Sequence, residues 1–200
     1  MRRKAFIILL FVGVLLTGCS LYKTAVNLSR LQFKLGKVNN FRLMNINISN
    51  KSKLSDFATL DVMQISSALL NNNLPVSFIL NVEAKNPNSK NGYGATDIYI
   101  KKFPWKLMIN NKETAHGDIQ NPFKVPGVSG FTTIPISVEF NLLKFFHNNS
   151  LDDVANLVFS IGGKNGSSSN FKLIAEPLLA TSWGDIQYPE PITIINKNFK

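Results

Sequence analysis

An alternation of apolar and polar side chains between residues 74 and 85, in which only Ile79 breaks the polar face, constrains the fold more than any other feature of the sequence. Every second residue there is apolar: Val76, Phe78, Leu80, Val82 and Ala84. Successive side chains of a β-strand point to opposite faces of a sheet, so the pattern predicts a strand with one buried and one solvated face. Residues 131–140 repeat it. Half-buried strands are typical of antiparallel sheets, which excludes an all-helical fold.

About seven strands are predicted in total, joined by turns rich in Asn, Gly and Pro. Residues 41–48 form one of them, with a slip between Leu43 and Ile46 that we interpret as a β-bulge. Residues 95–109 form a long strand whose Pro104 confines it to an edge or a bulge. Short turns between many strands favour an antiparallel β-sandwich with about two added helices.

One helix is predicted between residues 56 and 73, and a second begins near Ser150. The first has an apolar stripe at helical spacing: Ala58, Val62, Ile65 and Leu69. A second apolar stripe lies on roughly the opposite side: Leu60, Met63 and Leu70. Two interpretations stay open, because the second stripe either packs against the N-terminal segment or lines an apolar groove. In the second case these three residues form a candidate ligand groove beside the helix at 58–72.

The N-terminus has the layout of a secretory signal peptide. Arg2, Arg3 and Lys4 precede an apolar run of twelve residues that ends at Leu16, which is shorter than the roughly 20 residues that a spanning helix needs. The following Thr17-Gly18-Cys19 resembles the bacterial lipobox. That resemblance implies acylation of Cys19 and cleavage before it, and two or three acyl chains anchor a protein stably.

Three segments follow from this interpretation: a lipoprotein signal peptide at 1–18, a lipidated tether with a first strand at 19–37, and a β-sandwich domain at 38–200. By resemblance to enterobacterial sorting, Ser20 after the cysteine implies the outer membrane. We therefore expect a protein of the cell envelope that is anchored by lipid and faces the periplasm.

The composition narrows the possible partners. The chain of 200 residues has 22 basic and 12 acidic residues, a net charge of +10, and cleavage of the signal peptide lowers this to +7. The lysines are spread along the chain and no basic-aromatic platform stands out, so no nucleic-acid partner is expected. The expected partners are the membrane, through the acyl chains, and envelope proteins or lipids.

Motifs for catalysis or cofactor binding are missing from the sequence. Its one cysteine excludes an internal disulfide and a cysteine-based zinc site, and His116 and His147 stand apart from other ligand types. The glycine-rich segments at 127–130 and 162–167 lack the spacing of a nucleophile elbow or a P-loop. We expect a protein that is not an enzyme, with no catalytic residue, no metal and no cofactor.

The region from about residue 74 to 140 resembles the late embryogenesis abundant (LEA) type 2 family, also called the water stress and hypersensitive response (WHy) domain. The resemblance lies in an ordered set of segments: Asn86-Pro87-Asn88, Leu107-Met108-Ile109-Asn110, Ala115-His116-Gly117, Val125-Pro126-Gly127 with Gly130, and Thr133-Ile134-Pro135-Ile136. It implies a fibronectin-III-like or immunoglobulin-like sandwich, a link to desiccation and stress tolerance, and no defined catalytic residue.

Two functions are compatible with these features. The first is a non-catalytic, membrane-anchored envelope lipoprotein that protects or binds other proteins, for example under water stress. The alternative is a periplasmic module that binds a lipid or another apolar ligand in the groove beside the helix. Cys19, as the lipid attachment site, is the functional residue that the sequence indicates most directly.

Overall fold

The computed structural model describes residues 30–87, 97–109, 111–127, 130–145, 151, 155–156, 158–159, 171–181 and 184–195. In this part of the chain the strands form three four-stranded sheets, and every pairing is antiparallel. The mainly antiparallel β class is therefore confirmed. Cys19 and the predicted signal peptide lie outside the described residues.

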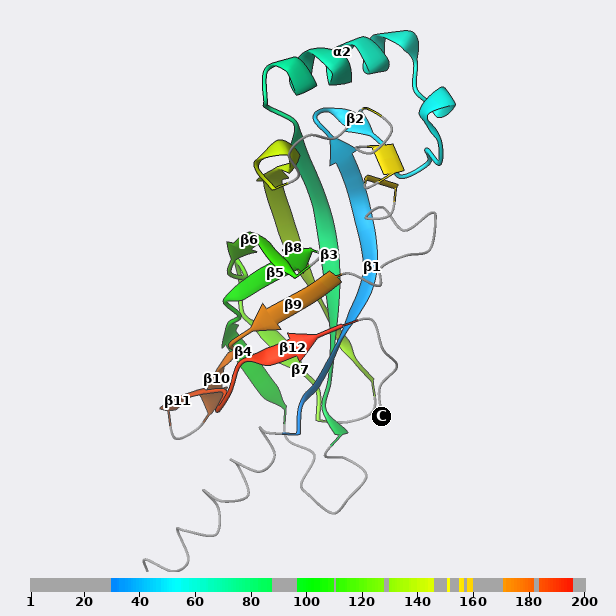
Figure 1. Ribbon diagram of the computed structural model, residues 1–200. Coiled ribbons are helices and arrows are strands. Elements are labelled where there is room, and N and C mark those ends of the chain that lie inside the picture. The colour runs from blue at the N-terminus through cyan, green and yellow to red at the C-terminus, as the bar shows by residue number, and fades with distance from the viewer. Residues whose placement is uncertain are drawn as a thin grey trace, which may run out of the picture.

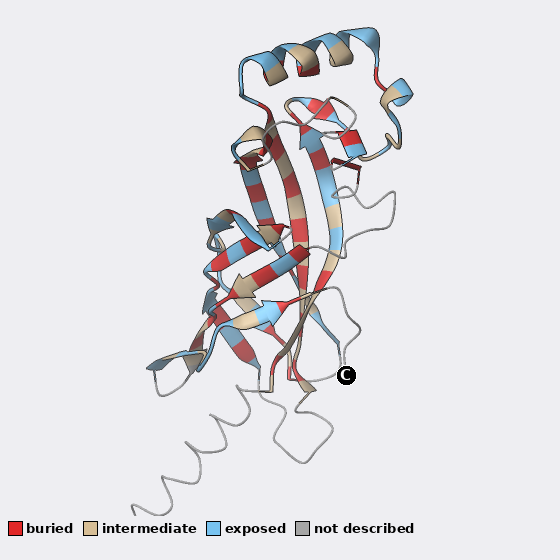
Figure 2. Cartoon of the chain, viewed as in Figure 1, coloured by how far each residue is buried: buried red, intermediate tan, exposed pale blue. Residues whose placement is uncertain are grey.

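The first layer is the sheet with strand order β2-β1-β3-β8. Its central strand, β3 (Pro75–Lys85), pairs with β1 (Gln32–Leu43) on one side and with β8 (Thr132–Asn141) on the other, and β2 (Ile46–Asn47) extends it beyond β1. All five alternating apolar residues of β3 are buried, as the sequence predicts. The alternation of burial along the strands is visible in Figure 2.

The second layer consists of two half-sheets. The first half-sheet contains β11 (Gly184–Gln187), β10 (Leu178–Thr181), β4 (Ile98–Lys102) and β7 (Phe123–Val125), in that order. The second contains β12 (Ile192–Ile194), β9 (Phe171–Ala175), β5 (Trp105–Ile109) and β6 (Lys112–Gly117). The chain passes between the half-sheets at Pro104 and at Pro177, where a proline interrupts the ladder.

Phe78 of β3 links the two layers. Its ring stacks on Phe41 with centroids 5.2 Å apart and makes edge contacts with Phe140 and with Phe171 of β9, each at 6.4 Å. The half-sheet of β9 therefore packs on the first layer through aromatic side chains, which carry a large buried area per residue. Figure 1 shows β9 and β12 lying over β3, with β12 reaching β1.

One end of the molecule is covered by helix α2 (Thr59–Leu70), which follows a short 3-10 helix, η1 (Leu54–Asp56). The helix predicted between residues 56 and 73 is thus confirmed. It lies across the end of the first layer (Figure 1), and Ile65 and Ala68 are its buried residues. A second 3-10 helix, η3 (Leu142–Lys144), follows β8.

Two predicted features differ from the structure. The slip between Leu43 and Ile46 is a hairpin turn and not a bulge, because these two residues pair and Met44 turns the chain at φ 57°. The strand predicted at 95–109 is divided at Pro104 into β4 and β5, which belong to different half-sheets. Residue 37, where the predicted tether ends, lies inside β1, which pairs with β3 with register shifts between residues 35 and 38 and between residues 39 and 42.

Only part of the second predicted helix lies within the described residues. Residues 151, 155–156 and 158–159 are helical, and Ala155, Val158 and Phe159 are buried. The ring of Phe159 packs 6.1 Å from that of Phe57, near α2. Within the described ranges, no helix has the length and hydropathy needed to cross a bilayer.

Candidate functional site

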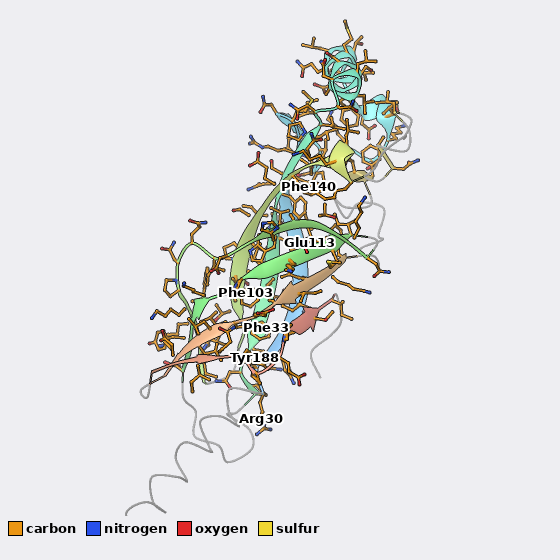
Figure 3. The ribbon with its side chains drawn as sticks, turned by 60° about the vertical axis from the view of Figure 1, so that its left-hand side comes forward. Arg30, Phe33, Phe103, Glu113, Phe140 and Tyr188 are labelled. Carbon is orange, nitrogen blue, oxygen red and sulfur yellow. The ribbon has the colours of Figure 1, made fainter. Side chains whose placement is uncertain are left out.

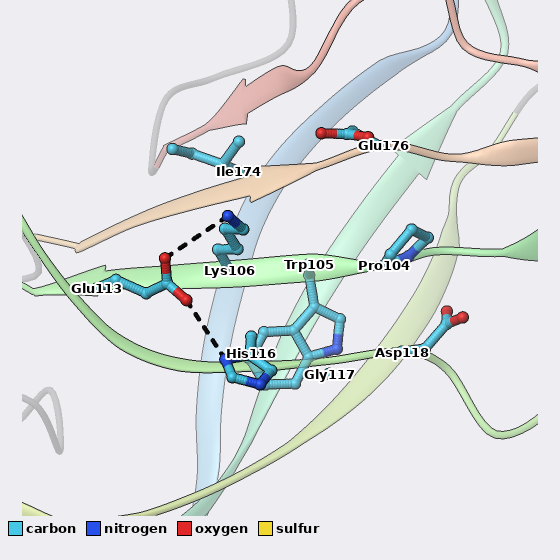
Figure 4. A pocket seen from close by; sticks show the side chains of 9 residues that line it. All are labelled: Pro104, Trp105, Lys106, Glu113, His116, Gly117, Asp118, Ile174 and Glu176. Carbon is cyan, nitrogen blue, oxygen red and sulfur yellow. Dashed lines mark ion pairs between the residues drawn. The ribbon is translucent and has the colours of Figure 1, made fainter.

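A groove of about 640 Å³ lies at the junction of β5, β6 and β9, next to the break at Pro104. The described residues that line it are Pro104, Trp105, Lys106, Glu113, His116, Gly117, Asp118, Ile174 and Glu176. Figure 4 shows how these side chains are arranged over the three strands. The volume falls within the range of roughly 300 to 1,000 Å³ that is usual for ligand sites.

The floor of the groove depends on a close contact between Trp105 and Gly117, which are paired residues of β5 and β6. The indole is 95% buried, because Trp105 is 5% exposed, and it lies against Gly117 (Figure 4). A Cβ atom at Gly117 would lie 2.8 Å from Cζ2 of the indole. Only glycine leaves room for the ring at this position, because carbon atoms pack at about 3.5 to 4.0 Å. Within the described part of the chain, the buried indole Nε1 has no hydrogen-bond partner.

A β-bulge in β6 brings Glu113 and His116 to the same side of the strand. Leu107 pairs with Ala115 and Met108 with Glu113, so Thr114 is the extra residue, and it is buried. On a regular strand, residues three apart point to opposite faces. The extra residue of the bulge brings the two side chains to the same face. The Glu113 carboxylate accordingly lies 3.3 Å from His116 Nδ1 and 3.6 Å from Lys106 Nζ.

The other side of the groove is acidic. Asp118 Oδ1 accepts hydrogen bonds from the backbone N–H groups of Phe103 at 2.6 Å and Ile119 at 2.8 Å, which fixes the carboxylate beside the break in the strand. Glu176 is fixed through its backbone, because its N–H donates to the Pro104 carbonyl at 3.0 Å. Its carboxylate is exposed at the end of β9.

The charge of the groove is opposite to that of the whole chain. Three carboxylates and one ammonium give its described lining a formal charge of −2 with His116 neutral, whereas the chain carries +10. Pro104, Trp105 and Ile174 supply the apolar part of the lining. Such a surface suits a ligand with an apolar body and a cationic end, for example a lysine side chain of an extended segment.

The described lining offers little for catalysis. It contains no Ser, Thr or Cys that the Glu113–His116 pair would activate, and the His116 side chain is 77% exposed. Among the residues that the structure describes, no cluster of three or more His, Cys, Asp or Glu residues is arranged to hold a metal ion.

The three residues predicted to line a groove beside α2 are on its solvent-exposed side. Leu60, Met63 and Leu70 are exposed on the outer surface of the helix. A hollow of about 290 Å³ does lie beside α2, but its described lining consists of other residues: Met44, Gln64, Ser67, Ala68, Asn71 and Asn73. The predicted lipid attachment site, Cys19, and His147 lie outside the described residues.

The groove is not evident from the amino-acid sequence. Ala115-His116-Gly117 was noted there only as part of a family resemblance, and His116 was interpreted as a histidine without partners. The contact of Gly117 with Trp105 depends on the strand register, and the bulge at Thr114 shifts that register by one residue. Pro104 within a predicted strand was the sequence signal that could have located the groove, since proline marks a place where the hydrogen-bond ladder is interrupted.

No protein-family model and no curated protein matches the chain. Among solved structures, the chain is similar to a protein from Archaeoglobus fulgidus, with 11% identity and a TM-score of 0.32 over 83% of this chain and 100% of that one. It is also similar to the solution structure of a "putative late embryogenesis abundant (LEA) protein", with 15% identity and a TM-score of 0.38 over 92% of this chain and 80% of that one.

Proposed function

We propose that the protein is a non-catalytic binding module of the cell envelope, anchored in a membrane by acyl chains on Cys19. The groove over Trp105 is the observation that carries the binding function, because it combines an apolar floor with an acidic rim on an otherwise basic protein. Its occupant is an extended, lysine-containing segment of another envelope protein. The apolar part of that segment lies on Pro104 and Ile174, and its ammonium group lies near Asp118 or Glu176.

The groove is tested with a pair of peptides that differ in charge. The full chain in non-ionic detergent is titrated calorimetrically with acetyl-Ala-Lys-Ala-Lys-Ala-amide and with the matching glutamate peptide. The lysine peptide is expected to bind more tightly. Asp118→Asn keeps the oxygen that accepts the two backbone bonds and removes the charge. Glu176→Gln removes the second charge of the acidic side and leaves the main-chain bond of residue 176 to Pro104 unchanged.

Each of these substitutions should weaken binding of the lysine peptide about two- to fivefold, the range expected for exposed ion pairs. Asp185→Asn is the matched control, because Asp185 pairs with Lys101 in the other half-sheet, away from the groove. Equal binding of both peptides, or the same loss in the control variant, would refute this assignment of the groove.

The anchor is supported by the sequence from Arg2 to Cys19 and by the position of the first described residue. Arg30 lies at the end of the molecule opposite to α2 (Figure 3), so the tether enters the domain at one end. In cells fed a labelled fatty acid, the wild-type chain should incorporate label and fractionate with membranes. Cys19→Ser should lose the label, and a label that persists in this variant would contradict the anchor.

The resemblance of residues 74–140 to the LEA type 2 family supports a protective role under water stress. The antiparallel layers joined through Phe78 support the fibronectin-III-like sandwich that this resemblance implies. A deletion strain is expected to survive drying less well than its parent, and the gene restored on a plasmid should recover survival. Survival equal to that of the parent, under drying and under envelope stress, would remove the stress role and leave the binding role intact.

The alternative function is a module that binds a lipid or another apolar ligand beside α2. The observation that favours it is the hollow of about 290 Å³ beside the helix. Native mass spectrometry of the purified protein would show a co-purified or added lipid if this function is correct. Persistent absence of any lipid adduct would exclude it.

A further inference from the structure

Helix α2 is apolar on two opposite sides, and only one side has a partner in the described structure. Ile65 and Ala68 are buried against the body, whereas Leu60, Met63 and Leu70 on the outer side are 64%, 64% and 87% exposed. A helix that is apolar all around is normally buried on all sides. The outer side of α2 is therefore the kind of apolar patch that marks an interaction surface.

The outer stripe has the spacing of a coiled-coil seam. Leu60, Met63, Ser67 and Leu70 stand at i, i+3, i+7 and i+10, which are successive a and d positions of two heptads. The stripe carries no charge. Asp61 is the one charged residue of the helix, and its carboxylate is held at the helix start, where it accepts a hydrogen bond from Ala58 N–H and lies 3.8 Å from Lys51 Nζ.

We propose that this stripe pairs with the same stripe of a second copy of the chain, with the two helices antiparallel. In the register centred on position 65, Leu60 lies opposite Leu70 of the other copy and Met63 lies opposite Ser67. Large residues meet at both ends, and in the middle the long Met63 side chain meets the small Ser67. The surface is thus complementary to itself, which an isologous two-fold contact requires.

Other occupants fit the stripe less well. Helices that lie in a membrane surface typically carry Lys or Arg on their polar side, and α2 contains neither. An antiparallel pair places the opposite partial charges of the two helix ends side by side, and the uncharged seam brings no like charges together. Two heptads of one helix bury far less surface than the roughly 800 Å² per partner of a stable interface. The pair is therefore weak and forms where the chains are locally concentrated.

The position of α2 allows this contact. The helix lies at the extreme end of the described structure (Figure 1), and Arg30 lies at the opposite end (Figure 3). Two copies therefore meet end to end, with Arg30 of each copy at the far end of the pair. If Cys19 is acylated, residues 20–29 span up to about 35 Å, so both copies reach one bilayer when the pair lies along it. The pairing itself does not rest on the anchor.

Two singly substituted full chains test the register. A copy with Leu60→Cys and a differently tagged copy with Leu70→Cys are expressed together in cells, and the cells are treated with a thiol oxidant. Each copy keeps two of the three large apolar side chains. Positions 60 and 70 of two paired copies are adjacent, whereas two residues at position 60 are separated by about 15 Å along the helices, too far for a disulfide.

The expected result is a mixed disulfide dimer from the two variants together and only background from either variant expressed by itself. The wild-type chain, whose one cysteine is Cys19, defines that background. A second Met63→Ser substitution in both copies should lower the yield of the mixed dimer without changing expression. Because position 63 is exposed, this variant is expected to fold.

Three outcomes would overturn the proposal. Disulfides between two Leu60→Cys chains would indicate a parallel pair, and equal yields from all combinations would indicate random collision. No disulfide in any combination would show that the copies do not pair through α2. If Met63→Cys is then shielded from a water-soluble thiol reagent in membranes and becomes reactive in detergent, the bilayer covers the stripe.

Discussion

The contact between Gly117 and Trp105 makes a quantitative prediction about the candidate groove. In Gly117→Ala, the new Cβ would lie 2.8 Å from Cζ2, 3.2 Å from Cε2 and 3.5 Å from Nε1 of the indole. The closest of these distances is about 0.7 Å shorter than a favourable carbon contact. The ring cannot swing away into solvent, because Trp105 is buried in the core.

Overpacking of a core typically costs about 1 to 3 kcal/mol. The loss of a glycine also restricts the unfolded chain, which offsets about 0.4 to 1 kcal/mol of that cost. We therefore expect Gly117→Ala to lower the free energy of unfolding by about 1.3 kcal/mol, the difference between the midpoints of these two ranges. Urea unfolding followed by far-UV circular dichroism measures this value without relying on tryptophan fluorescence.

A double-mutant cycle tests whether the contact between the new Cβ atom and the indole causes this loss of stability. Trp105→Phe removes Cζ2 and Nε1 and leaves a smaller ring, so it should lower stability by itself through a cavity. In the double variant, however, the alanine Cβ no longer meets the indole. The combined loss should then be smaller than the sum of the two single losses by about 1 kcal/mol, within the usual range for residues in contact. Losses that add to within about 0.5 kcal/mol, or a Gly117→Ala protein as stable as the wild type, would refute the steric argument.

Two further predictions concern stability away from the groove. Asn141→Ala removes the side-chain acceptor of two backbone N–H groups, including that of the fully buried Leu74 at 3.1 Å. It should lower the free energy of unfolding in a urea titration by about 1 to 3 kcal/mol. The control Asn121→Ala, at an exposed position outside the strands, should leave this free energy unchanged. The hydrogen bond from the Lys124 ammonium group, 2.6 Å from Asp97, lowers the pKa of that carboxyl below its ordinary 3.8. The resulting stabilisation is complete above pH 3.8 and is lost as the pH falls through the lower folded-state pKa of Asp97. Lys124→Met should therefore raise the Asp97 pKa in an NMR titration and make acid unfolding begin at a higher pH. An unchanged Asp97 pKa would contradict the pairing.

The parts of the fold that follow from local patterns could be predicted from the sequence. β3 and β8 were predicted because the apolar residues at every second position match one buried face, and each strand lies within a residue or so of the predicted range. Helix α2 was predicted from the spacing of its inner stripe, of which Ile65 is buried. In these elements the period of the apolar residues and the local conformation depend on the same geometry.

The candidate groove could not be predicted in this way, because it arises from pairing between strands. The bulge at Thr114 determines that Glu113 and His116 share a side, and it also determines that Gly117 lies opposite Trp105. A regular hairpin would have placed a different residue opposite the indole. The two apolar sides of α2 were visible in the sequence, but which side faces the body depends on where the helix packs.

The prolines of the second layer connect the fold to the groove. Strands β4 and β5 are separated at Pro104, and strands β9 and β10 are separated at Pro177, at the same level of neighbouring strands. The break leaves Phe103 N–H and Pro104 C=O outside the regular ladder, and they bond instead to the Asp118 carboxylate and to Glu176 N–H. Two of the three acidic residues of the groove, Asp118 and Glu176, are thus placed by backbone groups that the break releases. A buried backbone group needs a partner, so the interruption of the sheet and the position of the acidic rim have one physical cause.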